Sequence, residues 1–390
     1  MRILLLTDGI YPYTPGGMAK HSYYLAKYLS LSGQQVHLIH CGPENGLGEE
    51  KENIDFQDFN HNNITFQFIP FPAGDAFPGH YVRANKRYSQ DILEVIKNTL
   101  PAFDLIYAQG FTGYAFLREG INRQIPLITN LHGYEMFQQP PSFRVRLEHQ
   151  LIRPIARYVS LNSNFIFSFG GKITDLLLKA GIKENQILES PIGIESDWLV
   201  DQPSPSAKRR RFIFTGRYER RKGVQELTAA LKQLLQEPGL PEFEFHFIGP
   251  IPAEHRISHP NIFYHGELRQ AEKVKAILKT GDIFVCPSHS EGMPTVNMEA
   301  MACGLALLLT DVGAVSRQFA DNGWLLARPE VGLLKNALRE AIMLSPEEIN
   351  TFKQRSLAHV RRHFIWSEVV KHKITLFDRA LAQFHSTAVH

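Results

Sequence analysis

Among the polar residues of this sequence, the two glutamates Glu291 and Glu299, separated by seven residues, are the most promising candidates for a functional site. Glu291 follows an apolar run, Asp282–Pro287, that predicts a buried strand, and Glu299 lies in a short predicted helix that ends at Gly304. Carboxylates accept hydrogen bonds from sugar hydroxyls, and the free amides at a helix start attract phosphate. The spacing favours a site for a polyol phosphate over the alternative, a pair of solvated helix-end acids.

The residues between the two glutamates suit the same interpretation. Gly292 lets a ligand approach the backbone closely, Met293 follows it, and Pro294 fits the first turn of a helix. A second buried strand, Leu305–Leu309, is expected after the helix. The pattern is therefore strand, loop, helix, glycine and strand, with the polar residues in the loop.

A basic loop, Gly216–Gly223, carries four cations in six residues and follows another predicted strand. Arg217 and Lys222 in this loop could hold an anion at the carboxyl end of that strand. A solvated basic loop is the alternative from these residues alone.

Three further candidates lie in the first half of the chain. His132 follows the predicted strand Leu127–Leu131, although a single histidine is more often structural than functional. Gly16 and Gly17 precede a predicted helix, where they would let an anion approach the backbone. They could equally be turn glycines without a function.

Buried strands alternate with helical patterns along the whole chain, which predicts a doubly wound α/β fold. The clearest linker is Pro203–Arg211, with two prolines, two serines and a basic run. At 390 residues the chain suits two domains, which we place at 1–200 and 201–364, followed by a helical segment at 365–390. The segment Glu44–Asn63 is expected to be a solvated excursion. The further strands are expected at Arg2–Thr7, Val36–His40, Thr65–Ile69, Leu105–Ala108, Phe165–Phe169, Phe212–Thr215, Glu244–Ile248 and Ile262–His265.

Composition excludes several classes of protein. The chain has 44% hydrophobic and 21% charged residues and a formal charge of +3, values that do not indicate a nucleic-acid partner. The three cysteines are far apart and show no metal spacing, which favours a cytoplasmic protein with buried thiols. No apolar stretch is long enough for a signal peptide or a membrane span.

The segment Phe143–Tyr158 combines four arginines with an apolar set, and Pro154 is expected to interrupt its helix. Such a basic amphipathic surface could rest on the anionic inner face of a membrane. An ordinary helix that packs against the core is the equal alternative.

Together, the Glu-Gly-x-Pro-x-x-x-x-Glu pattern and its strand–loop–helix setting resemble retaining, nucleotide-sugar-dependent glycosyltransferases of family 4. The resemblance implies the GT-B fold, in which two Rossmann-like domains face each other across a cleft and the last helix crosses back onto the first domain. It implies transfer of a hexose from a nucleoside-diphosphate sugar to an acceptor hydroxyl, without a metal or another cofactor.

The resemblance also implies roles for the residues named above. His132 and Glu291 would contact the donor sugar, Arg217 and Lys222 the diphosphate, and Glu299 the ribose. Leu268 would lie at the nucleobase pocket. The substrate-binding set is completed by Gly16, Gly17, Gly292, Met293 and Pro294.

Surface-polysaccharide or glycolipid assembly is the setting that the resemblance favours, with a carbohydrate or lipid-linked acceptor. One alternative is an enzyme with a small acceptor, which makes a disaccharide or a glycosylated metabolite. Another is a nucleotide-sugar-binding protein without turnover.

Overall fold

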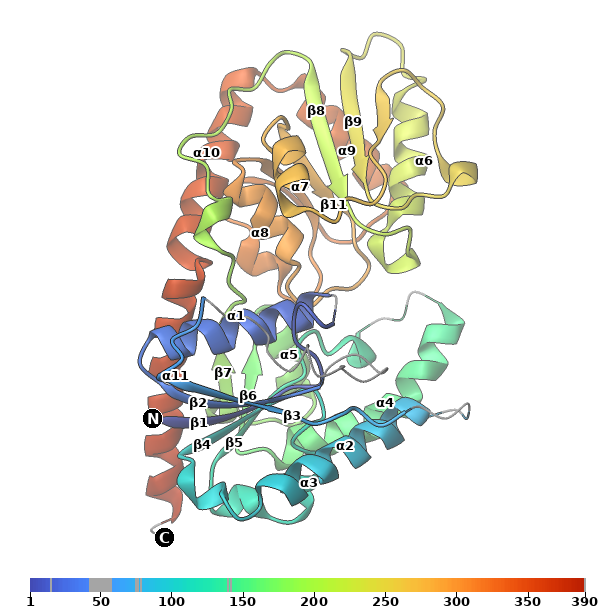
Figure 1. Ribbon diagram of the computed structural model, residues 1–390. Helices are drawn as coiled ribbons and strands as arrows, with labels where there is room; N and C mark the ends of the chain where they lie inside the picture. The colour runs from blue at the N-terminus through green and yellow to red at the C-terminus, as the bar shows by residue number, and fades with distance from the viewer. Residues whose placement is uncertain are drawn as a thin grey trace. The chain divides into compact units, whose positions relative to one another are not determined.

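The computed structural model of the protein describes residues 1–14, 16–41, 58–73, 77, 79–138, 140 and 142–388. The chain divides into two compact units. Unit 1 contains Met1–Phe137, Arg146–Gly193 and Trp366–His390, and unit 2 contains Gln138–Val145 and Ile194–Ile365. Each unit has one parallel β-sheet with helices on both faces (Figure 1), which confirms the prediction of two doubly wound α/β domains.

Unit 1 is built on a seven-stranded sheet in the order β3-β2-β1-β4-β5-β6-β7. Its strands β1, β4, β5 and β6 are almost wholly buried apolar runs, as a parallel sheet covered on both faces requires, whereas the edge strand β3 is only partly buried. The strand order reverses between β1 and β4, and ligands of open α/β sheets bind at such a switch point. The strands are β1 (Arg2–Leu6), β2 (Gln35–His40), β3 (Ile64–Phe68), β4 (Leu105–Gln109), β5 (Leu127–Asn130), β6 (Phe165–Ser168) and β7 (Ile187–Glu189).

The helices of unit 1 cover this sheet. The apolar faces of α1 and of the last helix of the chain, α11, meet the strands in one core, in which the two helices also pack against each other. The helices are α1 (Gly17–Leu31), α2 (His80–Ile96), α3 (Tyr114–Arg118), α4 (Phe143–Asn162), α5 (Lys172–Lys179) and α11 (Trp366–Ala388). The first three residues of α4 belong to unit 2.

Unit 2 repeats the arrangement with six strands in the order β10-β9-β8-β11-β12-β13. Its order reverses between β8 and β11, so the loops after these two strands meet at the switch point. The strands are β8 (Arg210–Thr215), β9 (Phe243–Ile248), β10 (Ile262–Tyr264), β11 (Ile283–Cys286), β12 (Ala306–Thr310) and β13 (Gly323–Leu326). The helices are α6 (Val224–Leu234), α7 (Ala271–Leu278), α8 (Thr295–Ala302), α9 (Val331–Met343) and α10 (Pro346–His363).

The last helix, α11, belongs to unit 1 although it follows unit 2 in the chain. Its first residue, Trp366, is fully buried and packs on the backbone of Gly193. A Cβ atom on Gly193 would lie 2.4 Å from Cδ2 of the indole. Val370 and Phe377 continue the same contact into the core of unit 1.

The structure corrects three expectations. The Pro203–Arg211 segment is not a linker throughout, because Arg210 begins β8 and its guanidinium is buried against the carbonyl oxygens of Ala341 and Leu344. Helix α4 continues through Pro154, although proline has no N–H to donate. Residues up to 57 of the predicted excursion lie outside the described residues, but Phe59 is buried in the core of unit 1.

Candidate active site

Glu291 is the centre of a buried polar cluster at the switch point of unit 2. It lies in the loop after β11 and is 6% exposed. Its Oε1 atom is 2.6 Å from Nζ of Lys222, at the end of the loop after β8, and accepts a hydrogen bond of 2.8 Å from Ser288. Arg221 Nη1 lies 3.3 Å from the other carboxylate oxygen. The structure thus brings together Glu291 and Lys222, two residues that are 69 positions apart in sequence.

The second predicted cation, Arg217, has a different environment. Its side chain is 70% exposed and pairs with Glu219 at 2.9 Å, whereas the Lys222 side chain is 14% exposed. Arg220 also pairs with a carboxylate, that of Glu226. The basic loop is therefore a set of ion pairs, in which Lys222 and Arg221 reach Glu291.

The segment that follows Glu291 has the predicted local structure. After Gly292 the chain buries Met293 and Pro294, and α8 begins at Thr295. The helix ends at Ala302, and Gly304 adopts the left-handed conformation (φ 78°) before β12. Glu299 is half-buried in the middle of α8. The amides of the first turn of α8 therefore lie next to the Glu291 cluster in sequence and at the same edge of the sheet.

A close backbone contact holds the Glu291 loop in place. Gly313, in the loop after β12, has φ 56°, and a Cβ atom there would lie 2.0 Å from the carbonyl oxygen of Glu291. Ala314 N donates to Gly292 O at 2.8 Å in the same contact. The two loops can pack this closely only because position 313 has no side chain.

Leu268 lies in the loop that follows β10, the edge strand of unit 2. Its side chain is half-buried. It is thus placed at the same end of the sheet as the basic loop after β8, with β9 between the two strands.

In unit 1, His132 follows β5 at the carboxyl end of the sheet. Its φ of 59° is in the left-handed region, as is that of Tyr134 (φ 50°), so the turn between them is held in a sparsely populated conformation. Asn130 Oδ1 accepts a hydrogen bond of 2.8 Å from His132 N and fixes the start of the turn. Burial lowers the pKa of His132 to about 3, with a further contribution from the charge of Lys373. The imidazole is therefore neutral at physiological pH.

The glycine pair lies at the start of α1 in unit 1. Gly16 has φ 123° at the N-cap position, and Gly17 is the first residue of the helix. Chain neighbours aside, a Cβ atom at either position would meet no atom of the described residues within 4 Å. The backbone here is open to a ligand, and the positive φ of Gly16 disfavours other residues.

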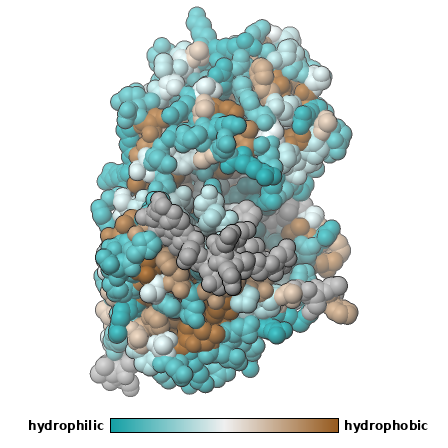
Figure 2. All heavy atoms as spheres, in the orientation of Figure 1, coloured by the Kyte–Doolittle hydropathy of each residue, from teal (hydrophilic) through white to brown (hydrophobic). Residues whose placement is uncertain are grey.

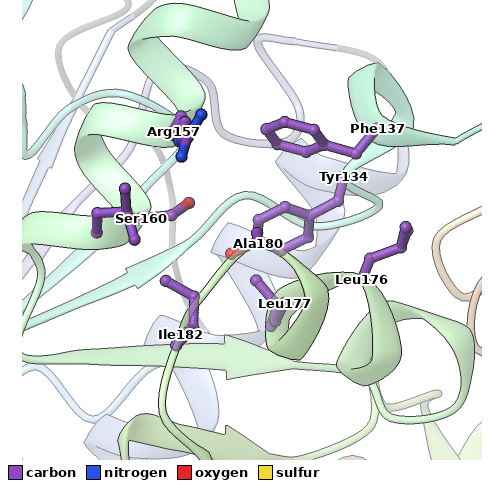
Figure 3. Close-up of a pocket in the computed structure, with 9 residues that line it drawn as sticks. Tyr134, Phe137, Arg157, Ser160, Leu176, Leu177, Ala180 and Ile182 are labelled. Atoms are coloured by element: carbon purple, nitrogen blue, oxygen red, sulfur yellow. The ribbon is translucent and has the colours of Figure 1, made fainter.

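A small pocket lies next to Tyr134, the last residue of the His132–Tyr134 turn (Figure 3). Tyr134 and Phe137 of the turn point toward α4 and α5, and Arg157 lies at one side. The volume open to the centre of a water-sized sphere is about 10 Å³, which suits one water molecule and not a sugar. The hydroxyls of Tyr134 and Ser160 are both buried there. The predicted site residues do not line this pocket, which therefore serves to anchor the turn.

Sequence reasoning missed four residues of these clusters: Arg221, Ser288, Gly313 and Gln109. Arg221 was part of the basic loop, but nothing in the local pattern distinguished it from Arg220. Gly313 follows a predicted strand, and a glycine at such a position could have suggested a close backbone approach.

Two family models match the chain. One describes "Glycosyltransferase Family 4" and matches residues 15–198, and the other describes "Glycosyl transferases group 1" and matches residues 209–343. Together they cover most of both units.

Individual relatives agree with these matches. The chain is 30% identical to the alpha-maltose-1-phosphate synthase of Mycobacterium tuberculosis over 82% of both proteins. It is 28% identical, over 70% of this chain and 69% of the relative, to TuaC of Bacillus subtilis, whose name assigns it to teichuronic acid biosynthesis as a glycosyltransferase.

Among solved structures, sucrose-phosphate synthase from Thermosynechococcus elongatus has a similar fold, with a TM-score of 0.76 and 17% identity over 98% of this chain and 99% of the other. With two parallel-sheet units and these matches, the chain belongs to glycosyltransferase family 4 and has the GT-B fold of two Rossmann-like domains.

Proposed function

We propose that the protein is a retaining, metal-independent glycosyltransferase that moves a hexose from a nucleoside-diphosphate sugar to an acceptor hydroxyl. The observation that carries this proposal is the buried pair of Lys222 and Glu291 at the switch point of unit 2, beside the start of α8. It offers a cation for a phosphate and an acid for sugar hydroxyls in one place.

Unit 2 would bind the donor. Lys222 and Arg217, together with the first amides of α8, would face the diphosphate, and Glu291 would accept hydrogen bonds from the sugar hydroxyls. Glu299 would hold the ribose, and Leu268 would lie at the nucleobase. The backbone of Gly292, Met293 and Pro294 would line the phosphate side.

Unit 1 would supply His132 and the Gly16–Gly17 backbone. His132 would orient the donor sugar and would not act as a general base, which fits an imidazole whose pKa, lowered by burial to about 3, makes it a weak base. In the transfer step the bond from the anomeric carbon to the diphosphate oxygen breaks, and a bond to the acceptor oxygen forms on the same face. The proton of the acceptor hydroxyl leaves with the diphosphate or with solvent.

The direct test is an assay with a panel of nucleoside-diphosphate hexoses in excess EDTA, followed by proton NMR of the product. We expect turnover in EDTA and an α-linked product from an α-linked donor. A β-linked product would refute retention. Activity that is lost on chelation and restored by Mg²⁺ or Mn²⁺ would refute the metal-free mechanism.

Glu299→Ala is expected to weaken binding of the bare nucleoside diphosphate. A charged acceptor paired with hydroxyls contributes about 1.5–3 kcal/mol, which corresponds to roughly 10–150-fold in Kd. Calorimetric titration would measure the change. An unchanged Kd would show that Glu299 does not contact the ribose.

The acceptor is the second part of the proposal. TuaC is named for teichuronic acid biosynthesis, and this name supports a role for our protein in surface-polysaccharide assembly, with a carbohydrate or lipid-linked acceptor. A small acceptor is the second candidate, because alpha-maltose-1-phosphate synthase is named for a small product. Contact with lipid would distinguish the two.

Helix α4 offers a surface for such contact. Phe143, Leu147 and Leu151 are 73%, 54% and 50% exposed and, four residues apart, lie on one face of the helix. Figure 2 shows tan and brown side chains at the right-hand edge of the molecule, over the position of α4 in Figure 1. Exposed Arg146 and Arg157 border this stripe, and arginines beside an apolar stripe suit anionic headgroups. Among the described residues, no helix is long and apolar enough to cross a bilayer.

We expect the triple variant Phe143→Ser, Leu147→Ser, Leu151→Ser to lose at least about 10-fold in binding to vesicles with anionic lipid, because each apolar side chain contributes on the order of 1 kcal/mol or more when it enters the bilayer. Vesicle co-sedimentation would measure the binding. A control with Leu31→Ser and Val95→Ser removes similarly exposed apolar residues from α1 and α2 and should bind normally. Equal binding of all three proteins would contradict the surface.

A further inference from the structure

A buried chain of hydrogen bonds ends on the ring of His132. Nε2 of His132 is 3.2 Å from the amide group of Gln109, the last residue of β4. The same amide atom is 2.9 Å from Ser22 Oγ, and Ser22 Oγ is 2.9 Å from Thr7 Oγ1. Thr7 Oγ1 in turn lies 2.8 Å from the carbonyl oxygen of Gly9. The side chains of all four residues in this hydrogen-bond network that take part through their side chains (Thr7, Ser22, Gln109 and His132) are buried.

The direction of these bonds follows from counting protons. Each hydroxyl has one proton to donate. If the amide oxygen of Gln109 faces Ser22 and His132, the Ser22 hydroxyl must donate its proton to Gln109. The Thr7 hydroxyl must then donate its proton to Ser22. The carbonyl of Gly9 then receives no proton from Thr7, and the buried NH₂ group of Gln109 has no hydrogen-bond partner among the residues that the structure describes.

The opposite orientation of the amide satisfies more groups. Amide oxygen and nitrogen have nearly the same shape, so the orientation is decided by the hydrogen-bond network. With the nitrogen toward Ser22 and His132, its two protons go to Ser22 Oγ and His132 Nε2. The Ser22 proton goes to Thr7 or to the carbonyl oxygen of Met18, which is 3.1 Å from Ser22 Oγ. The Thr7 proton goes to Gly9 O. The group left unpaired is one amide oxygen, and a buried oxygen without a partner is less rare than a buried N–H without one.

We propose that Gln109 directs its amide nitrogen to His132 Nε2 and thereby keeps the His132 proton on Nδ1, from which it donates to an oxygen of the donor sugar. Gln109 is then a positioning residue, which acts on the substrate through His132. The proposal rests on the proposed function for its second half, since the sugar contact requires a sugar donor.

The surroundings of His132 suit a neutral donor ring. Nδ1 makes no hydrogen bond to the residues that the structure describes. The rings of His21 and Phe169 pack against the imidazole, with centroids 5.1 and 5.9 Å away. Burial and the charge of Lys373 lower the pKa of His132 to about 3, so that only one ring nitrogen carries a proton at pH 7. Which nitrogen this is depends on the partner of the other one.

The first test reads the tautomer without a substrate. Long-range ¹H–¹⁵N NMR on ¹⁵N-histidine-labelled, ligand-free protein distinguishes protonated from unprotonated ring nitrogens, and the resonances that disappear in His132→Asn assign the residue. We expect the proton on Nδ1. A proton on Nε2 would overturn the proposal, whether or not the protein is active.

The second test changes the partner. Glutamate has the shape of glutamine but offers only acceptors when ionised, so Gln109→Glu should move the His132 proton to Nε2. We expect kcat to fall about 10–100-fold, the effect of roughly one to two lost hydrogen bonds, with an unchanged Kd for the nucleoside diphosphate. Gln124→Glu, a change at an exposed glutamine of unit 1, serves as the control and should leave both values unchanged.

The outcomes separate the two proposals. If NMR finds the proton on Nδ1 but the protein has no transferase activity, the proposed function is wrong and the proposed orientation of the Gln109 amide still holds. Normal kcat in a folded Gln109→Glu variant whose proton has moved would overturn the positioning role. If Gln109→Glu does not fold, the spectrum of the unmodified protein still decides the tautomer.

Discussion

Lys222→Met is expected to lower kcat about 100–1,000-fold and to raise the donor KM much less. Negative charge grows on the diphosphate as it leaves, and a fixed cation stabilises that charge more in the transition state than in the bound donor. Removing one such preorganised group from a water-poor site commonly has an effect of this size. Lys222 is nearly buried and contacts Glu291 directly, so no solvent cation can replace it readily.

Two variants are matched controls for this prediction. Lys222→Arg keeps the charge and should retain more activity than Lys222→Met. Arg217→Met should lower kcat only about 10-fold, because the Arg217 side chain is mostly exposed and already paired with Glu219. Steady-state kinetics over a range of donor concentrations would separate kcat from KM. If Lys222→Met and Arg217→Met lower kcat equally, Lys222 does not contribute more to catalysis than Arg217, and its buried ion pair with Glu291 has no special role.

Gly313→Ala is expected to lower the free energy of unfolding by roughly 2–5 kcal/mol, from a left-handed backbone and overpacking together. Its new Cβ atom would lie 2.0 Å from Glu291 O and 2.6 Å from Gly292 O. The backbone of the Glu291 loop must therefore shift, and turnover should fall even in the fraction of protein that remains folded. Urea unfolding and kcat per folded molecule would measure the two effects.

Gly332→Ala is the control for this substitution. Gly332 lies in the first turn of α9, its φ is not in the left-handed region, and its Cβ atom would meet nothing within 4 Å. Alanine there should be neutral or stabilise by up to about 1 kcal/mol. Normal stability and kcat in Gly313→Ala would contradict the view that this contact fixes the position of Glu291.

The sequence allowed the local architecture of the donor side to be predicted closely. The strand before Glu291, the helix after Pro294 and the left-handed Gly304 all depend on neighbouring residues, and each lies within one or two residues of its predicted place. The short edge strands β7 and β13 were missed, because three or four residues give little periodicity.

Contacts between distant residues could not be predicted in the same way. Arg210 reads as part of a solvated basic run, but its side chain points inward from the sheet. There the backbone carbonyls of Ala341, near the end of α9, and of Leu344, just after α9, accept its hydrogen bonds. Gln109 and Ser22 are 87 positions apart, and only the order of β1, β4 and β5 brings them to His132. Local sequence patterns do not reveal which distant residues come into contact.

The position of α11 has a consequence for the order in which the chain folds. A ribosome releases residues 1–193 and then residues 194–365, which complete unit 2, before Trp366 appears, yet Trp366, Val370 and Phe377 are part of the core of unit 1. During synthesis the first unit must therefore wait with an open apolar face, while the second has every segment it needs and can fold first. A fragment that stops at residue 193 would remain in this waiting state and would be prone to aggregate.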